Sequence, residues 1–251
     1  MKLIIGYLYP NLLNLYGDRG NIECIVQRCA WRDIEVEVKP ISIDTQLTDE
    51  LVNQISLIFM GGGEDHSQKQ LYNDFVNVKG KLIRRYIEDN GVGLFICGGY
   101  QLLGSYYQPY KGEKIKGLNI LDIDTRHFGR DKKRCVGNVN CKIIGIQYLK
   151  NKNLVGFENH GGRTYLQTET QALGTTITGN GNNDQDKTEG VFYKNTIGTY
   201  LHGPLLPKNP HLADYLIKIA LEKKYKQDIE LKTLDDELEW KAHKHAIELE
   251  K

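Results

Sequence analysis

The chain has 251 residues, enough for one large domain or for one domain with an appendage. Lys and Arg total 33 against 32 for Asp and Glu, so the bulk charge favours neither nucleic acid nor an anionic membrane surface as a partner. The apolar start MKLIIGYLYP is too short for a signal peptide, and no window has the apolar length of a membrane span. We therefore expect a cytoplasmic protein whose binding depends on a local site.

The cysteines argue against two kinds of structural support. Their number is odd and no two form a CxxC pair, which is unlike a disulfide framework and unlike a structural zinc site. Free cysteines are most often small core residues, and only Cys97 has unusual neighbours. No metal site is expected. The cysteines are Cys24, Cys29, Cys97, Cys135 and Cys141.

The first hundred residues alternate apolar strands with amphipathic helices. The runs 55–60 and 92–97 are continuously apolar, as in strands that are buried on both faces of a parallel sheet. This alternation predicts an α/β fold in which helices flank a mostly parallel, doubly wound sheet. The expected strands cover residues 2–10, 34–41, 55–60 and 92–97, and the expected helices cover residues 21–32 and 79–89.

The pattern changes after Gly117. Shorter strand-like pieces alternate with Gly and Asn turns, which predicts antiparallel additions in the C-terminal half. We expect residues 1–228 to form the main domain and residues 229–251 to form a charged helical segment that packs on its surface. The strand-like pieces cover residues 118–125, 135–146, 153–159 and 190–201, and a last helix of the main domain is expected over 211–224.

The segment LFICGGYQLLG, residues 94–104, resembles a nucleophile elbow in its pattern. Cys97 ends a buried strand and precedes a Gly-Gly turn and the helix-capable stretch YQLLGSYY, at the edge where doubly wound folds bind ligands. Such a turn holds a nucleophile in a strained conformation with its reactive atom exposed, and Gly98 and Gly99 keep the backbone clear. The helix N-terminus would stabilise a thiolate and an oxyanion. A structural core cysteine beside a tight turn is the alternative.

The glycine loop Gly61-Gly62-Gly63 follows the strand 55–60. Glycines there allow backbone N–H groups to approach a ligand closely, which would add a second oxyanion donor. Phosphate binding is the other use of such a loop. The chain contains neither GxxxxGK[ST] nor GxGxxG, so the nucleotide interpretation lacks its lysine and its spacing.

A cysteine nucleophile requires a base, which is most often histidine. His202 follows GTYL at a strand end and precedes Gly203-Pro204, so it would stand at the rim of a sheet on a rigid loop. His160 in GFENHGGRT competes closely. Sequence spacing does not decide which of the two approaches Cys97.

These segments together resemble a known family. ICGGYQLLG is similar to the GxCxGxQ elbow of class I glutamine amidotransferases. The other matching segments resemble the cobyric acid synthase-like branch, and within it the glutaminase subunits of lipid II isoglutaminyl synthases. The resemblance runs in order from about residue 3 to 225 and implies a flavodoxin-like class I amidotransferase fold. The matching segments are the 61–63 loop, NLYGDRGNI (14–22), GFENHGGRT (156–164) and GTYLHGPLLPKNP (198–210).

The resemblance implies roles for the reacting groups. Cys97 matches the nucleophile that attacks the side-chain amide of glutamine, and His202 matches the general base and acid. The backbone N–H groups of Gly98 and of the glycine loop, most closely that of Gly62, match the oxyanion hole. Many members carry HxE at the histidine, but here the sequence reads His202-Gly203-Pro204. We therefore expect a Cys–His dyad, or a third group supplied from elsewhere.

The resemblance also implies a pocket for glutamine. Gln101 matches the glutamine of GxCxGxQ, which lines the substrate pocket. Arg134 in KKRCVGN matches an arginine that holds the α-carboxylate, and a guanidinium suits that task. Arg126 and Arg130 are close alternatives, and exposed solubilising charge is the ordinary fate of such arginines. Asp18 is interpreted first as the cap of the following helix, with a place on an ammonia path or a subunit interface as the alternative.

The function implied by the resemblance is hydrolysis of L-glutamine to supply ammonia to a MurT-like Mur ligase subunit in a heterodimer. That ligase would amidate the α-carboxyl of D-glutamate in the lipid II stem peptide to D-isoglutamine. No cofactor is expected in this chain, and ATP and Mg are expected on the partner. Two alternatives stay open: a cysteine hydrolase on a flavodoxin-like fold that acts on another amide, and a non-catalytic binding module with a structural cysteine.

Overall fold

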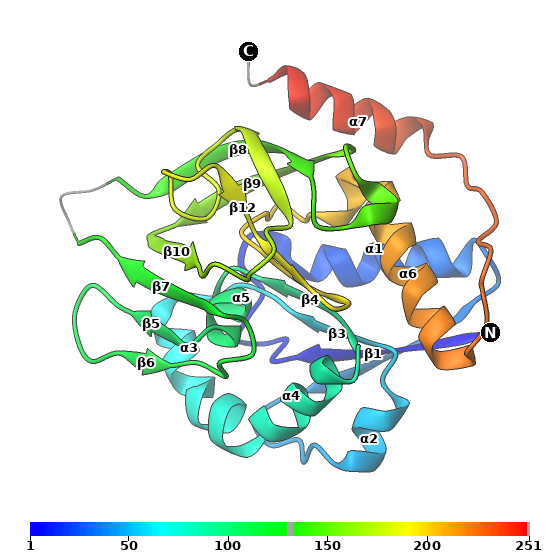
Figure 1. Cartoon of the computed structure of the whole chain (residues 1–251). Coiled ribbons are helices and arrows are strands. Elements are labelled where there is room, and N and C mark those ends of the chain that lie inside the picture. Colours follow the sequence, from blue (N-terminus) through cyan, green and yellow to red (C-terminus); the bar gives the residue numbers. More distant parts are fainter. Residues whose placement is uncertain (130–132, 250–251) are drawn as a thin grey trace.

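A six-stranded sheet with the strand order β13-β14-β4-β3-β1-β2 runs through the centre of the molecule (Figure 1). The computed structural model describes residues 1–129 and 133–249. All neighbouring strands are parallel except β13, which forms an antiparallel hairpin with β14. The strands are β1 (Lys2–Leu8), β2 (Glu35–Ile41), β3 (Leu57–Met60), β4 (Val92–Ile96), β13 (Val191–Tyr193) and β14 (Thr196–Thr199).

Helices cover both faces of this sheet. Figure 1 shows α1 (Arg19–Ala30) and α6 (Pro210–Tyr225) on one face, with α2 (Asp49–Gln54) and α4 (Gly80–Glu88) on the other. α3 (Asp65–Asn73) continues into a π-helical turn, Asp74–Val78. The strands and helices predicted for the first hundred residues are confirmed within a few residues, and so is the predicted α/β class.

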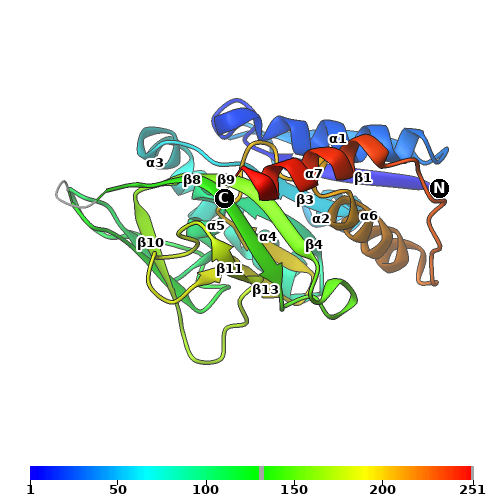
Figure 2. The same ribbon diagram turned by 90° about the horizontal axis from the view of Figure 1, so that it is seen from above.

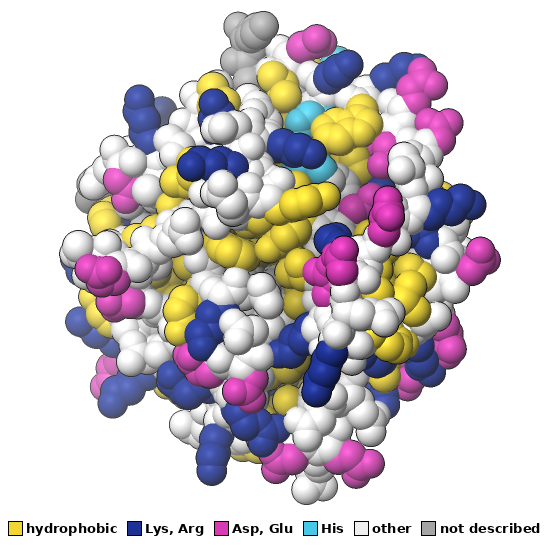
Figure 3. All heavy atoms as spheres, turned by 45° about the vertical axis from the view of Figure 1, so that its right-hand side comes forward, with side chains coloured by type: hydrophobic (Ala, Val, Ile, Leu, Met, Phe, Trp, Pro, Cys, Tyr) yellow, Lys and Arg dark blue, Asp and Glu magenta, His cyan; other side chains and the backbone are white. Residues whose placement is uncertain are grey.

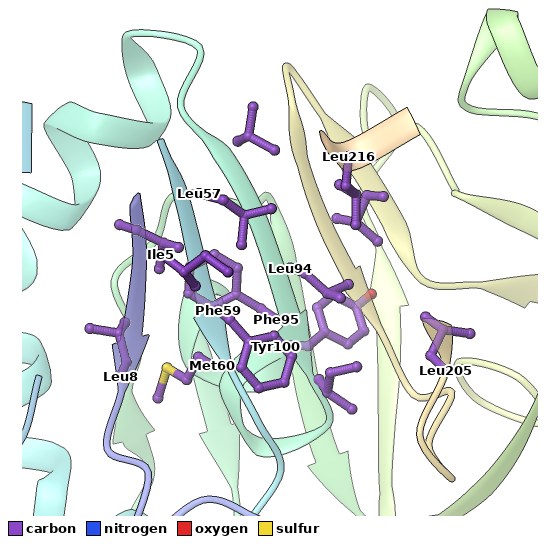
Figure 4. Packing of buried hydrophobic residues seen from close by; sticks show 14 of the residues in the cluster. Ile5, Leu8, Leu57, Phe59, Met60, Leu94, Phe95, Tyr100, Leu205 and Leu216 are labelled. Carbon is purple, nitrogen blue, oxygen red and sulfur yellow. The ribbon is translucent and has the colours of Figure 1, made fainter. Parts of the chain in front are cut away.

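The core lies where the apolar runs predicted it. Every residue of β3 and β4 is buried. Figure 4 shows Ile5 and Leu8 of β1 packing beside Phe59 and Met60 of β3, with Phe95 of β4 next to them. A strand that is covered by helices on both faces needs apolar residues at every position, which explains the continuous pattern.

Two smaller sheets form the second half of the chain, and the predicted antiparallel additions are confirmed. One has the order β10-β7-β5-β6 and the other β12-β11-β8-β9. Their strands are antiparallel apart from the β5–β7 pair. The bounds are β5 (Tyr106–Gln108), β6 (Ile115–Lys116), β7 (Ile123–His127), β8 (Cys135–Ile143), β9 (Asn153–His160), β10 (Gly162–Leu166), β11 (Gly174–Thr178) and β12 (Thr188–Glu189). Short 3-10 turns lie at Leu15–Gly17, Gln147–Leu149 and Leu206–Lys208.

The expected extension of the helix after Cys97 is wrong at its C-terminal end. α5 covers only Gly98–Leu103. The N–H of Ser105 donates to the Ile123 carbonyl over 2.8 Å, and Tyr106 already pairs with β7 as part of β5. YQLLGSYY contains good helix formers, but sheet pairing beyond Gly104 decides the backbone conformation there.

The C-terminal segment is helical only in part. α7 covers Glu237–Glu248, whereas residues 227–236 cross the surface without helix, so the helical pattern expected from about residue 230 begins later. The buried guanidinium of Arg28 pairs with Asp214 of α6 and with Asp236 just before α7, each at 2.7 Å. The Trp240 ring of α7 stacks on His211 at 5.2 Å. Figure 2 shows α7 lying over the body of the protein. The domain boundary at residue 228 stays a prediction.

One face of the molecule carries charged side chains of both signs. In Figure 3, Lys and Arg side chains are interspersed with Asp and Glu side chains, and hydrophobic groups gather in a hollow of that face. Across residues 1–129 and 133–249, no helix combines the length with the apolar character that crossing a membrane requires.

Candidate active site

Cys97 occupies a strained turn between β4 and α5. Its φ of 49° and ψ of −106° lie outside the ordinary regions for a non-glycine residue. Its N–H donates to the Thr199 carbonyl over 2.8 Å, which ties the turn to β14. Such strain costs on the order of 1–3 kcal/mol and persists where the surroundings impose it. The conformation is the one that the nucleophile-elbow interpretation requires.

The side chains of Cys97 and His202 meet beside Gly62. A Cβ atom on Gly62 would lie 2.7 Å from Cε1 of His202 and 3.0 Å from Cβ of Cys97, so a larger residue would push the pair apart. His202 is fully buried, and its backbone exchanges two hydrogen bonds with Phe157 at 2.7 and 3.1 Å. The Tyr16 ring packs edge-on against the imidazole at 5.1 Å. The structure therefore brings His202 to the cysteine.

Asp18 supplies a third group to this pair. Its Oδ1 lies 3.0 Å from Nδ1 of His202, and its Oδ2 accepts the N–H of Gly62 over 2.7 Å. Asp18 is fully buried. Within the described part of the chain, its side chain makes no capping hydrogen bond to α1, so the interpretation as a helix cap is wrong. A carboxylate on Nδ1 fixes the ring orientation and leaves Nε2 facing the nucleophile.

The charge state of His202 follows from these contacts. Burial alone would lower the pKa of His202, but interactions with the Asp18 carboxylate and with Cys97 outweigh it and raise the pKa to about 10. Nε2 makes no hydrogen bond of good geometry to any described residue. The protonated imidazole of His202 therefore lies beside the side chain of Cys97, where it can donate a proton to a leaving group.

One of the two predicted oxyanion donors already has a hydrogen-bond partner in this structure. The first N–H groups of a helix have no partner within the helix, which suits Gly98 at the start of α5. The Gly62 N–H is engaged with Asp18 in this structure. The role of Gly62 as an oxyanion donor stays a prediction, and Gly63, which lines the neighbouring cavity, offers an alternative N–H.

His160 belongs to a different cluster. Its ring stacks on Tyr200 with centroids 3.7 Å apart, and its Nδ1 lies 2.7 Å from the Gly162 carbonyl. Burial lowers its pKa despite the Glu158 carboxylate at 3.6 Å. Glu158 itself accepts N–H groups from Asn180 and Gly181. The GFENHGGRT segment thus holds the wall of the site together, and His202 is the better candidate base.

A cavity of about 350 Å³ opens next to Cys97. It has room for an amino acid, and polar groups converge on it from several elements. Its lining residues are Leu15, Tyr16, Gly63, Glu64, Gln68, Cys97, Gln101, Tyr107, His127, Arg134, Asn159, His160, Gly161 and Gly162.

Some of the predicted substrate-binding residues line this cavity and others do not. Arg134 lines it, and its Nε and Nη2 donate to the side chain and carbonyl of Asn159 over 2.9 and 3.1 Å, which fixes the guanidinium. Arg126 instead pairs with Asp124 at 2.7 Å and is not among the lining residues described. Arg130 lies outside the described residues. Gln101 is buried in the wall, where its Nε2 donates to the Tyr200 hydroxyl over 3.0 Å.

Comparison with known proteins identifies the family. Residues 4–210 match the family model of the CobB/CobQ-like glutamine amidotransferase domain. The chain belongs to this glutamine amidotransferase family. It is 41% identical over 247 residues to a Staphylococcus aureus protein, covering 98% of this chain and 96% of the relative. It is 39% identical over 235 residues to a Streptococcus pneumoniae protein, covering 94% and 86%. Both relatives are named lipid II isoglutaminyl synthase (glutamine-hydrolyzing) subunit GatD.

Solved structures agree on the fold. A glutamine amidotransferase from Thermotoga maritima superposes with a TM-score of 0.54 at 14% identity, covering 98% of this chain and 94% of that one. The glutaminase domain of Trypanosoma brucei CTPS, solved with bound acivicin, gives a TM-score of 0.54 at 11% identity, covering 92% and 96%. The resemblance seen in the sequence motifs is confirmed, and the chain is a glutamine amidotransferase.

Proposed function

We propose that this chain is the glutaminase subunit of a lipid II isoglutaminyl synthase and that it hydrolyses L-glutamine through Cys97. The observation that carries the proposal is the Cys97–His202–Asp18 arrangement beside a cavity of amino-acid size. Relatives of nearly the same length, named as glutamine-hydrolysing subunits, support the choice of substrate.

Glutamine binds with its side-chain amide at Cys97 and its α-carboxylate at Arg134. The Nη1 group of Arg134 lies 3.5 Å from the position that a Cβ on Gly161 would occupy, at the cavity wall. Nε and Nη2 hold Asn159, so Nη1 is the guanidinium nitrogen that this proposal assigns to the substrate. An arginine that is already oriented loses little side-chain entropy when it binds a carboxylate.

The reaction then follows from the three side chains. The sulfur of Cys97 attacks the amide carbon, and the Gly98 N–H stabilises the oxyanion that forms. The C–N bond breaks as protonated His202 donates its Nε2 proton to the leaving nitrogen, which gives ammonia and a glutamyl thioester. His202 next takes a proton from water, and the hydroxide attacks the thioester to release glutamate. The raised pKa of His202 keeps the acid available at the start of the cycle.

The ammonia passes to an ATP-dependent ligase subunit that resembles MurT, forming a heterodimer in the cytoplasm. This partner binds ATP and Mg and amidates the D-glutamate α-carboxyl of lipid II to D-isoglutamine. The name shared by the two GatD relatives supports the acceptor and the need for a second subunit. Hydrolysis on this chain proceeds without a cofactor of its own.

A substrate comparison tests the proposal. We expect the chain, assayed with its partner ligase and ATP, to release ammonia from L-glutamine and to leave glutamine within peptides and L-asparagine unreacted. The measurement is ammonia release by a coupled glutamate dehydrogenase assay. Release from peptides in place of free glutamine would favour a cysteine hydrolase on the same fold. Silence with every amide would favour the non-catalytic binding module.

A further inference from the structure

Gln68 reaches the active site from α3, in a position that the sequence motifs did not mark. Its side chain is 3% exposed and lines the cavity. It packs against Gly98, because a Cβ atom added to Gly98 would lie 2.7 Å from Nε2 of Gln68. The carboxamide of Gln68 is therefore next to the residue that follows the nucleophile.

The orientation of this carboxamide is fixed by its neighbours. Nε2 donates to the Gly63 carbonyl over 3.2 Å and to Oε1 of Gln101 over 3.4 Å. Both partners are acceptors, so the nitrogen must face them and the oxygen must face away. Gln101 in turn donates to Tyr200, whose hydroxyl lies 2.6 Å from Oγ1 of Thr164. This series of buried bonds holds Gln68 in place.

Oε1 of Gln68 is buried without a hydrogen-bond partner among the described residues. Leaving a buried acceptor unpaired costs on the order of 1–3 kcal/mol, so such an atom in a binding site indicates a missing donor. Among the described residues that line the cavity, one other side-chain atom is buried without a hydrogen-bond partner. This atom is Nε2 of His160, which lies 3.6 Å from the Glu158 carboxylate. Gln68 thus brings a buried and unpaired acceptor to the wall of the cavity.

We propose that Oε1 of Gln68 accepts a hydrogen bond from the α-ammonium group of L-glutamine. This inference rests on the proposed function. The amide of the substrate is taken by Cys97 and the carboxylate by Arg134, and the ammonium has three donors and no acceptor. The carboxamide oxygen of Gln68 is an acceptor of the kind that an ammonium group requires. Gln68 therefore selects free α-amino acids over ω-amides that lack the ammonium group.

The test compares L-glutamine with glutaramate, which is glutamine without its α-amino group, using the full chain in complex with its partner ligase. Gln68→Met keeps the length of the side chain but removes the acceptor. Gln68→Glu keeps an acceptor but removes the Nε2 donors. We expect Gln68→Met to raise KM for L-glutamine about 10- to 100-fold, the range for a hydrogen bond to a charged group, and to leave kcat/KM for glutaramate nearly unchanged.

Gln68→Glu is expected to retain the preference for L-glutamine over glutaramate. Gln70→Met, an exposed change on the same helix, is the matched control. If Gln68 has a purely structural role, Gln68→Met and Gln68→Glu should each lower kcat/KM equally for L-glutamine and for glutaramate. This result would overturn the inference. An unchanged KM in Gln68→Met would also overturn it. A wild-type complex that hydrolyses neither compound would instead refute the proposed function, and the inference with it.

Discussion

Cys97→Ala is expected to abolish glutamine-dependent amidation by the complex and to leave amidation from added ammonium chloride intact. Without the sulfur no glutamyl thioester forms, and loss of a nucleophile lowers kcat by about 10⁴-fold or more. The ligase reaction on the partner needs ammonia and ATP but not this thiol. The measurement is the rate of D-isoglutamine formation with each nitrogen source.

Cys24→Ala is the matched control, since Cys24 lies on α1 and is not among the residues that line the cavity. It should behave as the wild type with both nitrogen sources. Glutamine-dependent activity that survives in Cys97→Ala would contradict the assignment of the nucleophile. Loss of the ammonium-dependent reaction as well would indicate damage to the complex, which a thermal unfolding curve would reveal.

Asp18→Asn is expected to lower kcat for glutamine about 100- to 1,000-fold and to shift the alkaline limb of the pH–rate profile from about pH 10 toward 6.5. The neutral amide no longer stabilises the imidazolium, so His202 loses its proton at lower pH. The measurement is kcat against pH for wild type and variant. Asp44→Asn, at an exposed position, is the control and should leave the profile unchanged.

The free energy of unfolding should also depend on the protonation of His202. Because the pKa of His202 is raised above its ordinary 6.5 in the folded chain, its pairing contributes fully to the free energy of unfolding below about pH 6.5. That contribution is lost as the pH rises toward 10. Asp18→Asn should therefore lower Tm more at pH 6 than at pH 10. An equal drop in Tm at both values, with an unshifted profile, would show that Asp18 is only a packing residue.

The sequence was sufficient to predict the elbow, because its signals are local. A buried strand, one cysteine and two glycines stand within a few residues of each other, and the backbone of Cys97 adopts the strained conformation that this pattern indicates. The choice between His202 and His160 was not local. It depends on how β9 and the loop after β14 pack, and the backbone pairing of Phe157 with His202 has no sequence signature.

Asp18 could not be assigned from the sequence for a related reason. It stands where a helix cap is expected, and 184 residues separate it from His202. The available signal was topological: the loop after β1 and the glycine loop after β3 follow neighbouring parallel strands, so they meet at one edge of the sheet. The same proximity explains why the Gly62 N–H binds Asp18, which a glycine pattern alone does not reveal.

The end of α5 shows the limit of local propensity. The helix-capable segment YQLLGSYY continues past Gly104, but Tyr106 and Tyr107 pair with the strand β7, more than a dozen residues later, and this pairing decides for strand. Gln68 was missed because α3 carries no motif. Its importance follows from one unpaired oxygen, which becomes visible only when the cavity is assembled.

The most direct test of the central claim is nitrogen transfer from glutamine to the acceptor. The complex of this chain with its MurT-like partner is supplied with ATP, lipid II and L-glutamine labelled with ¹⁵N at the side-chain amide, and the product is analysed by mass spectrometry. The account predicts D-isoglutamine that carries the label, formed only when Cys97 is present. Unlabelled product, or labelled product formed equally by Cys97→Ala, would contradict it.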